Sequence, residues 1–211
     1  MSNLFYVKSF EDDFVLKTVI DGKKVSSQSI EEIILSKKII PNTFSFGKKK
    51  RLACSTLHKN YLKTYRSQGL IFQTLVKPSE IYPFDLAVLT QTNKVIVKYY
   101  KIKDSLGEYY GKKLIEGYKE FLFNSFDELL SKFSSPKAVW IETNKLRKEF
   151  GYASLPISKF KLVEYNETIF DKPIKITPVA IFGYKKESRI LAKKFGLKYF
   201  KNAKEFYEKY F

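Results

Sequence analysis

Two residue types that build many catalytic sites are nearly missing from this chain of 211 residues, which holds one cysteine, Cys54, and one histidine, His58. One cysteine excludes an internal disulfide and a zinc site built on several cysteines. The sequence has no apolar run of the ~18 or more residues that a membrane span needs. The first 14 residues carry acids where a signal peptide has its basic and apolar regions. We therefore expect a cytoplasmic protein that does not bind membranes.

Acidic residues are also scarce, since 39 Lys and Arg face 22 Asp and Glu and leave a net charge of +17. Residues 33–79 contain no Asp or Glu at all. The cations of this acid-free stretch are Lys37, Lys38, Lys48, Lys49, Lys50, Arg51, Lys59, Lys63, Arg66 and Lys77. No acid within the stretch offsets their repulsion, which is the pattern expected where nucleic-acid phosphates supply the anions. The alternative is a lysine-rich composition with no functional meaning.

Aromatic and amide side chains lie among these cations. Arg, Gln and His can read base edges, and tyrosines can stack on unpaired bases. The predicted phosphate contacts are Lys48, Lys49, Lys50, Arg51, Lys59 and Lys63, and the predicted base readers are His58, Arg66 and Gln68. The alternative is a solvated basic face, with Tyr61 and Tyr65 packed in the core.

The order of predicted elements is mainly β, then helical, then β with helices at the end. Residues 13–35 read as a strand pair around Asp21-Gly22, followed by a short helix capped by Ser29. Residues 43–103 are rich in strand patterns, and residues 105–150 have helical spacing. Residues 160–170 and 174–184 read as strands before two closing helices. This order predicts one α+β nucleic-acid-binding domain over residues 1–211, with a largely antiparallel, strongly curved sheet, a central helical segment and C-terminal helices.

Helix boundaries in the central segment are marked by residue type. Ser125 followed by Glu128 is a capping-box signal. Ser135-Pro136 and Gly151 give the proline start and glycine stop of a further helix. Trp140, in the middle of that helix, is expected in the core.

Most common catalytic motifs are missing. Asp85 begins a predicted strand, as in metal-dependent nucleases, but the next strand, VIVKYYKIK, has Lys and Tyr where the second carboxylate belongs. Carboxylates recruited from elsewhere, such as Glu80, Glu164 or Glu167, would be the remaining route to a metal site. The sequence has no glycine-rich phosphate loop either. We therefore expect neither a metal nor a cofactor, and metal-free base excision remains, with Tyr65 and Asp85 as candidate catalytic residues.

Three segments, YLKTYRSQG, PFDLAVL and LVEYNETIF with the later PVAIFGY, together resemble a known family. They are similar to the metal-independent restriction enzymes of the half-pipe type, which excise adenine from a short palindrome as DNA glycosylases. The family uses a histidine and an aspartate near its C-terminus, where this chain has Tyr199 and Asn202. No catalytic residue is therefore carried over from the family.

The sequence thus predicts a homodimeric protein of restriction or repair type that binds double-stranded DNA and excises a base or cleaves without metal. A non-enzymatic RNA- or DNA-binding protein with the same surface is the main alternative. A structural partner protein whose basicity is incidental is a third.

Overall fold

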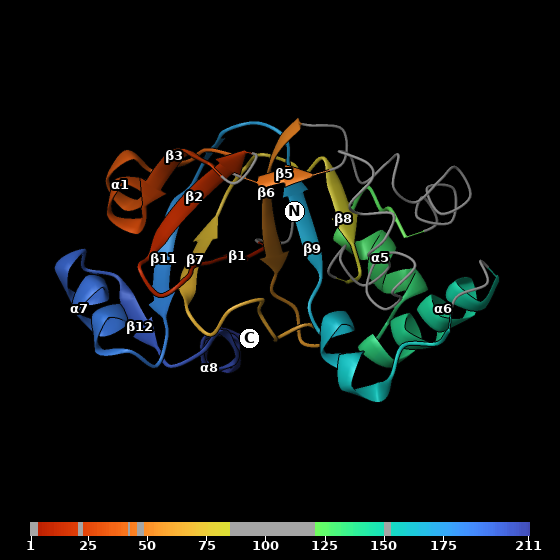
Figure 1. Ribbon diagram of the computed structural model, residues 1–211. Coiled ribbons are helices and arrows are strands. Elements are labelled where there is room, and N and C mark those ends of the chain that lie inside the picture. The colour runs from red at the N-terminus through yellow and green to blue at the C-terminus, as the bar shows by residue number, and fades with distance from the viewer. Residues whose placement is uncertain (1–3, 21–22, 42, 46–48, 85–120, 150–152) are drawn as a thin grey trace.

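The fold is built around one mixed sheet with helices on both of its flanks (Figure 1). It is seen in a computed structural model, which describes residues 4–20, 23–41, 43–45, 49–84, 121–149 and 153–211. The predicted turn at Asp21-Gly22, the helix stop at Gly151 and the predicted elements between residues 85 and 120 lie outside the described residues.

The main sheet has eight strands, seven of which form a continuous row. In spatial order they are β12 (Lys198–Phe200), β11 (Thr177–Phe182), β7 (Gly69–Gln73), β1 (Tyr6–Ser9), β6 (Lys49–Thr56), β9 (Glu167–Phe170) and β8 (Glu80–Tyr82), and β5 (Thr43–Ser45) pairs with β6. All neighbours in this sheet are antiparallel except β11 and β12. The α+β class and the mainly antiparallel sheet are therefore confirmed. The expected strong curvature is not, because no sheet within the described residues is closed or strongly curled.

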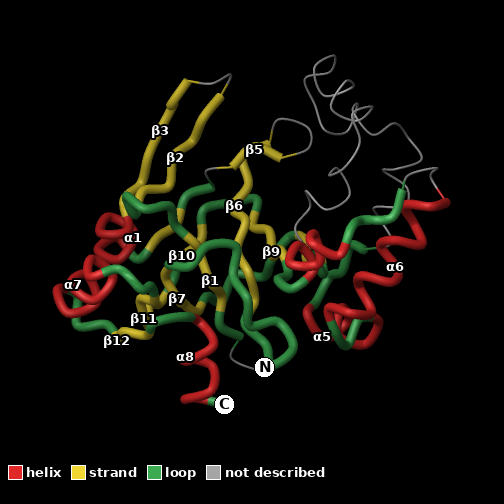
Figure 2. The backbone as a smooth tube through the Cα atoms, turned by 60° about the horizontal axis from the view of Figure 1, so that its bottom comes forward, coloured by secondary structure: helices red, strands yellow, loops and turns green. Residues whose placement is uncertain are grey.

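Helices and two small sheets flank this row (Figure 2). The helices are α1 (Ile30–Ser36), α5 (Phe126–Lys132), α6 (Pro136–Glu149), α7 (Lys186–Lys194) and α8 (Ala203–Tyr210), with the 3₁₀ helix η2 (Ile157–Val163). The small sheets pair β2 (Val15–Ile20) with β3 (Lys23–Ser29) and β4 (Lys38–Ile39) with β10 (Ile174–Lys175). Helices α1 and α7 lie on the side of β12, and α5 and α6 lie on the side of β8. None of the described helices is long and apolar enough to cross a membrane.

Local sequence signals explain where several helices begin. Ser29 forms a full capping box with Glu32, in which each side chain bonds the backbone N–H of the other residue. At α5 the Ser125 hydroxyl accepts from the Glu128 N–H as predicted, but the Glu128 carboxylate bonds the N–H of Asn124. The predicted hairpin of β2 and β3, the start of α6 and the two closing helices are likewise confirmed.

The expected strand over residues 160–170 is wrong in its first half. Residues up to Val163 form η2, and only Glu167–Phe170 are extended. In a 3₁₀ helix, residues three apart lie above one another, so Phe160 and Val163 turn to the same side. Both pack on the hydrophobic cluster that α5 and α6 share with β8 and β9. Tertiary burial of this pair therefore outweighs the strand propensity of the segment.

Trp140 joins α6 to η2 and generates a stability prediction. Its indole is partly buried and packs edge-to-face on Phe160, with ring centroids 5.4 Å apart. We expect Trp140→Ala to lower the free energy of unfolding by about 2–3 kcal/mol, less than for a fully buried aromatic residue. The matched control is Ile141→Ala, because Ile141 is the next residue of α6 and is 54% exposed; it should change stability by less than about 0.5 kcal/mol. Equal losses for both variants in urea unfolding would contradict this packing role.

Candidate functional site

The central strand β1 separates from its neighbour β6 partway along its length. β1 pairs with β7 from Tyr6 to Ser9, but with β6 only at Tyr6 and Val7. Past that point the side chain of Lys8 extends across, and its ammonium donates a hydrogen bond to the carbonyl oxygen of Ala53 on β6 at 2.8 Å. A lysine side chain thus bridges two strands where their backbone pairing has ended.

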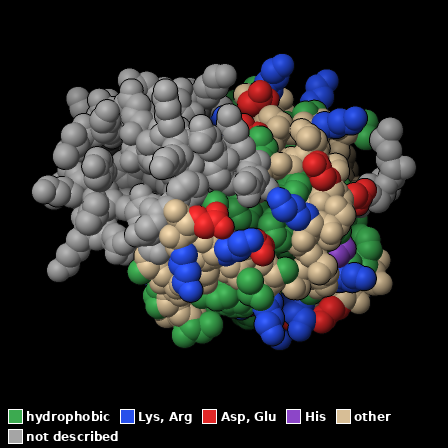
Figure 3. All heavy atoms as spheres, turned by 90° about the vertical axis from the view of Figure 1, so that its right-hand side faces the viewer, with side chains coloured by type: hydrophobic (Ala, Val, Ile, Leu, Met, Phe, Trp, Pro, Cys, Tyr) green, Lys and Arg blue, Asp and Glu red, His purple; other side chains and the backbone are tan. Residues whose placement is uncertain are grey.

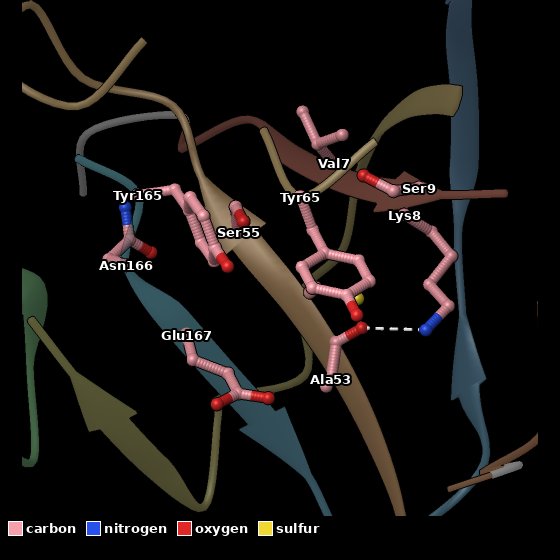
Figure 4. A pocket seen from close by; sticks show the side chains of 10 residues that line it. Val7, Lys8, Ser9, Ala53, Ser55, Tyr65, Tyr165, Asn166 and Glu167 are labelled. Atoms are coloured by element: carbon pink, nitrogen blue, oxygen red, sulfur yellow. Dashed lines mark hydrogen bonds between the residues drawn. The ribbon is translucent and has the colours of Figure 1, made fainter. Parts of the chain in front are cut away.

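A cavity of about 280 Å³ lies at this separation. Three strands and two loops supply its walls (Figure 4). The lining residues are Val7, Lys8, Ser9, Ala53, Cys54, Ser55, Tyr65, Tyr165, Asn166 and Glu167. Lys8 and Glu167 enter from opposite sides of β6, and the ring of Tyr65 lies over the strand. We call this cavity the Lys8 pocket.

Lys8 is the most unusual titratable group of the pocket, because the residue is only 7% exposed. Burial lowers the pKa of its amine from the ordinary 10.5, while Cys54 and Glu167 act in the opposite direction. Burial also raises the pKa of the Cys54 thiol to about 12, so Cys54 is neutral near pH 7. Glu167 is then the group whose negative charge favours the protonated amine. A lowered pKa makes the neutral, nucleophilic amine more abundant than in an exposed lysine.

Asn166 fixes the wall that carries Tyr165 and Glu167. Its amide makes two bonds with the backbone of Thr56, accepting from the N–H at 2.8 Å and donating to the carbonyl at 2.7 Å. The hydroxyls of Thr56 and Thr168 lie 2.7 Å apart and extend this buried network. Because buried polar groups are costly to leave unpaired, the network holds the start of β9 in one register against β6. The residues on either side of Asn166 are therefore held at the pocket.

One residue that lines the Lys8 pocket, Tyr65, is exposed and contacts a cation outside the pocket. Tyr65 is 56% exposed and packs edge-to-face on Tyr165, with centroids 5.8 Å apart. The Arg66 guanidinium lies 4.6 Å from the centroid of the Tyr65 ring and forms an exposed ion pair with Glu11 at 3.3 Å. Such a pair of side chains presents both a stacking surface and a phosphate-binding group.

The structure separates the other predicted base readers from this pocket. Gln68 is 2% exposed, and its amide donates to the backbone carbonyl of Glu11, so it serves the fold. His58 lines a different cavity of about 660 Å³ together with Asp127 and several aromatic residues. Burial, with a smaller effect of Lys59, lowers the pKa of His58. Arg66 contacts the ring of Tyr65 but lines a further cavity of about 320 Å³ together with Gln68 and Glu11.

Acids from elsewhere in the sequence compensate part of the acid-free stretch. Arg51 forms a poorly exposed ion pair with Glu80, and Lys63 pairs with Glu164 at 2.6 Å. Figure 3 shows the same mixing on one face, where Lys and Arg side chains lie among acidic ones. The expectation of uncompensated repulsion is therefore wrong for these cations and for Arg66.

The structure describes only some of the remaining predicted residues. Lys59 is exposed. Lys49 and Lys50 lie in β6, where they pair with β5, but their side chains are not described. Lys48 and the candidate catalytic Asp85 lie outside the described residues. Tyr65, the other candidate catalytic residue, lines the Lys8 pocket, whereas no sequence signal points to Lys8, and the pattern of acids suggests Glu167 only as a metal ligand.

Comparisons with protein-family models, with curated proteins and with solved structures find no match to this chain. The resemblance to the half-pipe restriction enzymes therefore stays a prediction. Within the described residues, no group of three or more His, Cys, Asp or Glu side chains is arranged to hold a metal ion. The Lys8 pocket and its rim are therefore the features from which a function can be inferred.

The burial of Lys8 predicts how stability depends on pH. The folded protein disfavours the charged amine, so this cost is present in full below the lowered pKa and disappears as pH rises toward 10.5. We expect wild type to gain stability relative to Lys8→Met across that window, by up to about 1.4 kcal/mol per pH unit. Denaturant unfolding of both proteins between pH 7 and pH 10.5 measures the difference, with Lys145→Met on the exposed face of α6 as the control for loss of a surface cation. A difference between wild type and Lys8→Met that does not change with pH would show that the amine is solvated.

Proposed function

We propose that the protein acts on DNA as a metal-independent, base-excising enzyme and that the Lys8 pocket receives the extruded nucleotide. One observation carries the proposal. A buried lysine, a glutamate and an exposed tyrosine are among the residues that line one pocket, and an arginine contacts the ring of that tyrosine. Perturbed titratable groups in a pocket are a common mark of catalytic sites.

The rim suits a nucleotide turned out of a duplex. Enzymes that act on a base must first extrude it, and they hold it by stacking and by hydrogen bonds to its edge. Tyr65 and Tyr165 offer ring faces and edges, and the hydroxyls of Ser9 and Ser55 offer donors and acceptors within the pocket lining. Arg66 is placed next to the stacking ring, where the flanking phosphate of an extruded nucleotide would lie.

The pocket also holds the two charges that base departure requires. Breaking the glycosidic bond leaves positive charge on the sugar and negative charge on the base. The Glu167 carboxylate is suited to stabilise the oxocarbenium-like sugar, and the Lys8 ammonium is suited to donate a proton to the departing base. Water then adds at C1′ to complete hydrolysis. Because burial makes Lys8 a stronger acid than an exposed lysine, it can give up this proton more readily.

The proposed contacts to DNA phosphates come from cations that now form weak ion pairs with carboxylates. The pairs of Lys63 with Glu164 and of Arg66 with Glu11 involve exposed lysine and arginine side chains. Surface ion pairs contribute only about 0–1 kcal/mol, so phosphates can replace the carboxylates at small cost. The net charge of +17 attracts the same polyanion at long range.

The second candidate function is a nucleic-acid-binding protein without catalytic activity. The exposed pair of Tyr65 and Arg66 favours it equally, because stacking and phosphate contact need no chemistry. In a binder the bridge from Lys8 to Ala53 would account for the buried lysine, but it would not account for the carboxylate that lines the same pocket. This is why base excision is the first choice.

The phosphate contacts generate a prediction about salt. We expect the double variant Lys63→Ala, Arg66→Ala to bind duplex DNA more weakly, with the slope of log affinity against log salt reduced by about 0.9 for each phosphate that is no longer neutralised. The control is Lys204→Ala, which removes an exposed lysine of α8 that pairs with Glu208. Fluorescence anisotropy over a salt series measures the slope. An unchanged slope in the double variant would show that Lys63 and Arg66 do not contact DNA phosphates.

Base excision itself is tested with mixed-sequence duplex DNA in the presence of EDTA, followed by alkali. Strand breaks that appear after alkali report abasic sites. We expect Glu167→Gln to reduce their rate of formation by about 10²-fold or more, because the carboxylate's charge is lost while its shape is kept. Glu187→Gln, an exposed carboxylate of α7, is the matched control. Breaks that need magnesium would indicate a hydrolytic nuclease, and no breaks at all would favour the non-catalytic binder.

A further inference from the structure

The cavity of about 660 Å³ that His58 lines is formed in part by α5 and by the end of α8. Its other walls come from the segments that precede β1, follow β6 and end β7. Among the described residues, it shares no lining residue with the Lys8 pocket. Small-molecule sites in proteins have volumes of about 300–1,000 Å³ and mainly apolar and aromatic walls. We call this second cavity the α5–α8 cavity.

Aromatic rings make up much of the lining of the α5–α8 cavity. They belong to Phe5, Phe126, Tyr207, Tyr210 and Phe211. The rings of Tyr207 and Phe211 are stacked with centroids 4.7 Å apart, and Phe5 packs edge-to-face on Phe211 at 5.5 Å. Tyr210 and Phe211 remain 39% and 67% exposed, so both are accessible to a ligand.

The face of an aromatic ring is electron-rich and attracts cations. Tyr210 shows this preference within the protein itself, because the exposed ammonium of Lys198 lies 4.3 Å from the centroid of its ring. Several such rings around one cavity can take the place of the water around a bound cation.

The charge of the lining has the same preference. Asp127, in the first turn of α5, is the one acidic or basic residue besides His58 among the described residues that line the cavity. Its carboxylate is exposed and forms no ion pair with a described residue. In a protein with a net charge of +17, this cavity therefore presents a negative group to its contents.

His58 adds no positive charge to offset that carboxylate. Burial, with a smaller effect of Lys59, lowers its pKa, while Asp127 acts in the opposite direction. The Nδ1 atom accepts a hydrogen bond from the N–H of Asn60 at 3.3 Å, which leaves the proton of the neutral ring on Nε2. His58 is thus a neutral hydrogen-bond donor at the cavity.

We propose that the α5–α8 cavity binds a small organic molecule that carries a quaternary, N-methylated ammonium group. Such a cation has no N–H to satisfy, so ring faces can surround it, and the Asp127 carboxylate balances its charge. His58 and the amide of Gln73 are the hydrogen-bonding groups available to an oxygen of the same molecule. DNA phosphates would be repelled by Asp127, so this site differs in ligand class from the proposed DNA-binding residues.

A neutral apolar ligand is the competing explanation, because aromatic walls also accept uncharged groups. Choline and its carbon analogue, in which a tert-butyl group replaces the trimethylammonium group, separate the two explanations because they share one shape and differ in charge. Ethanolamine keeps the charge of choline without the methyl groups, and its ammonium is strongly hydrated.

The first experiment titrates the full chain with each of these three compounds and follows binding by ligand-observed NMR. We expect choline to bind about 10-fold or more tightly than the carbon analogue and than ethanolamine. Equal dissociation constants for choline and its carbon analogue would show an apolar site and overturn the proposal. Ethanolamine binding as tightly as choline, or no binding of choline, would overturn it as well.

The second experiment places the ligand in the cavity. We expect Asp127→Asn and Tyr210→Leu each to weaken choline binding by about 5-fold or more, because one loses the charge and the other a ring. Tyr210→Phe, which keeps the ring, and Asp171→Asn, which removes an exposed carboxylate just after β9, are the matched controls and should bind choline normally. Thermal unfolding establishes that each variant is folded. Choline binding that neither Asp127→Asn nor Tyr210→Leu changes would exclude this cavity as the site.

Discussion

The hydrogen bond from Lys8 to Ala53 is the interaction on which the site depends. β1 is held in the sheet by β7 along its length, and its separation from β6 would leave an open seam without a side chain to cross it. A lysine can cross that seam, but only at the cost of burying an amine. The fold therefore couples a structural need to a chemical property, because the bridging group is a desolvated lysine beside a carboxylate.

The ion pairs of the acid-free stretch are also of two kinds, some structural and some available to a phosphate. The acid-free stretch of residues 33–79 does not form an unpaired basic surface, because Glu11, Glu80 and Glu164 reach its cations from elsewhere in the chain. The pair of Arg51 with Glu80 is poorly exposed and belongs to the fold, and Tyr82 also donates to that carboxylate. The pairs of the exposed cations Lys63 and Arg66 are of a different kind, since a phosphate can take the place of either carboxylate.

The features that could be predicted from the sequence are those determined by neighbouring residues in the chain. Ser29, Ser125 and the proline start of α6 follow from the unpaired N–H groups of a helix end, and the hairpin of β2 and β3 follows from pattern. It could not reach the pocket, whose parts are far apart in the chain: Asn166 bonds Thr56 across 110 residues. Lys8 also carries no local signal, since a lysine in a short alternating strand is normally solvent-facing, and its burial comes from the neighbours of β1 on both sides.

The Lys8 pocket is, in our proposal, the place where the protein acts on a nucleotide. The most direct measurement is a crystal structure with a duplex that contains a tetrahydrofuran, a stable mimic of an abasic sugar. We predict that this sugar lies in the pocket between Lys8 and Glu167, with Tyr65 against the extruded position and Arg66 on a flanking phosphate. A duplex that lies elsewhere, such as along the cavity lined by His58, with the Lys8 pocket closed to it, would contradict the proposal.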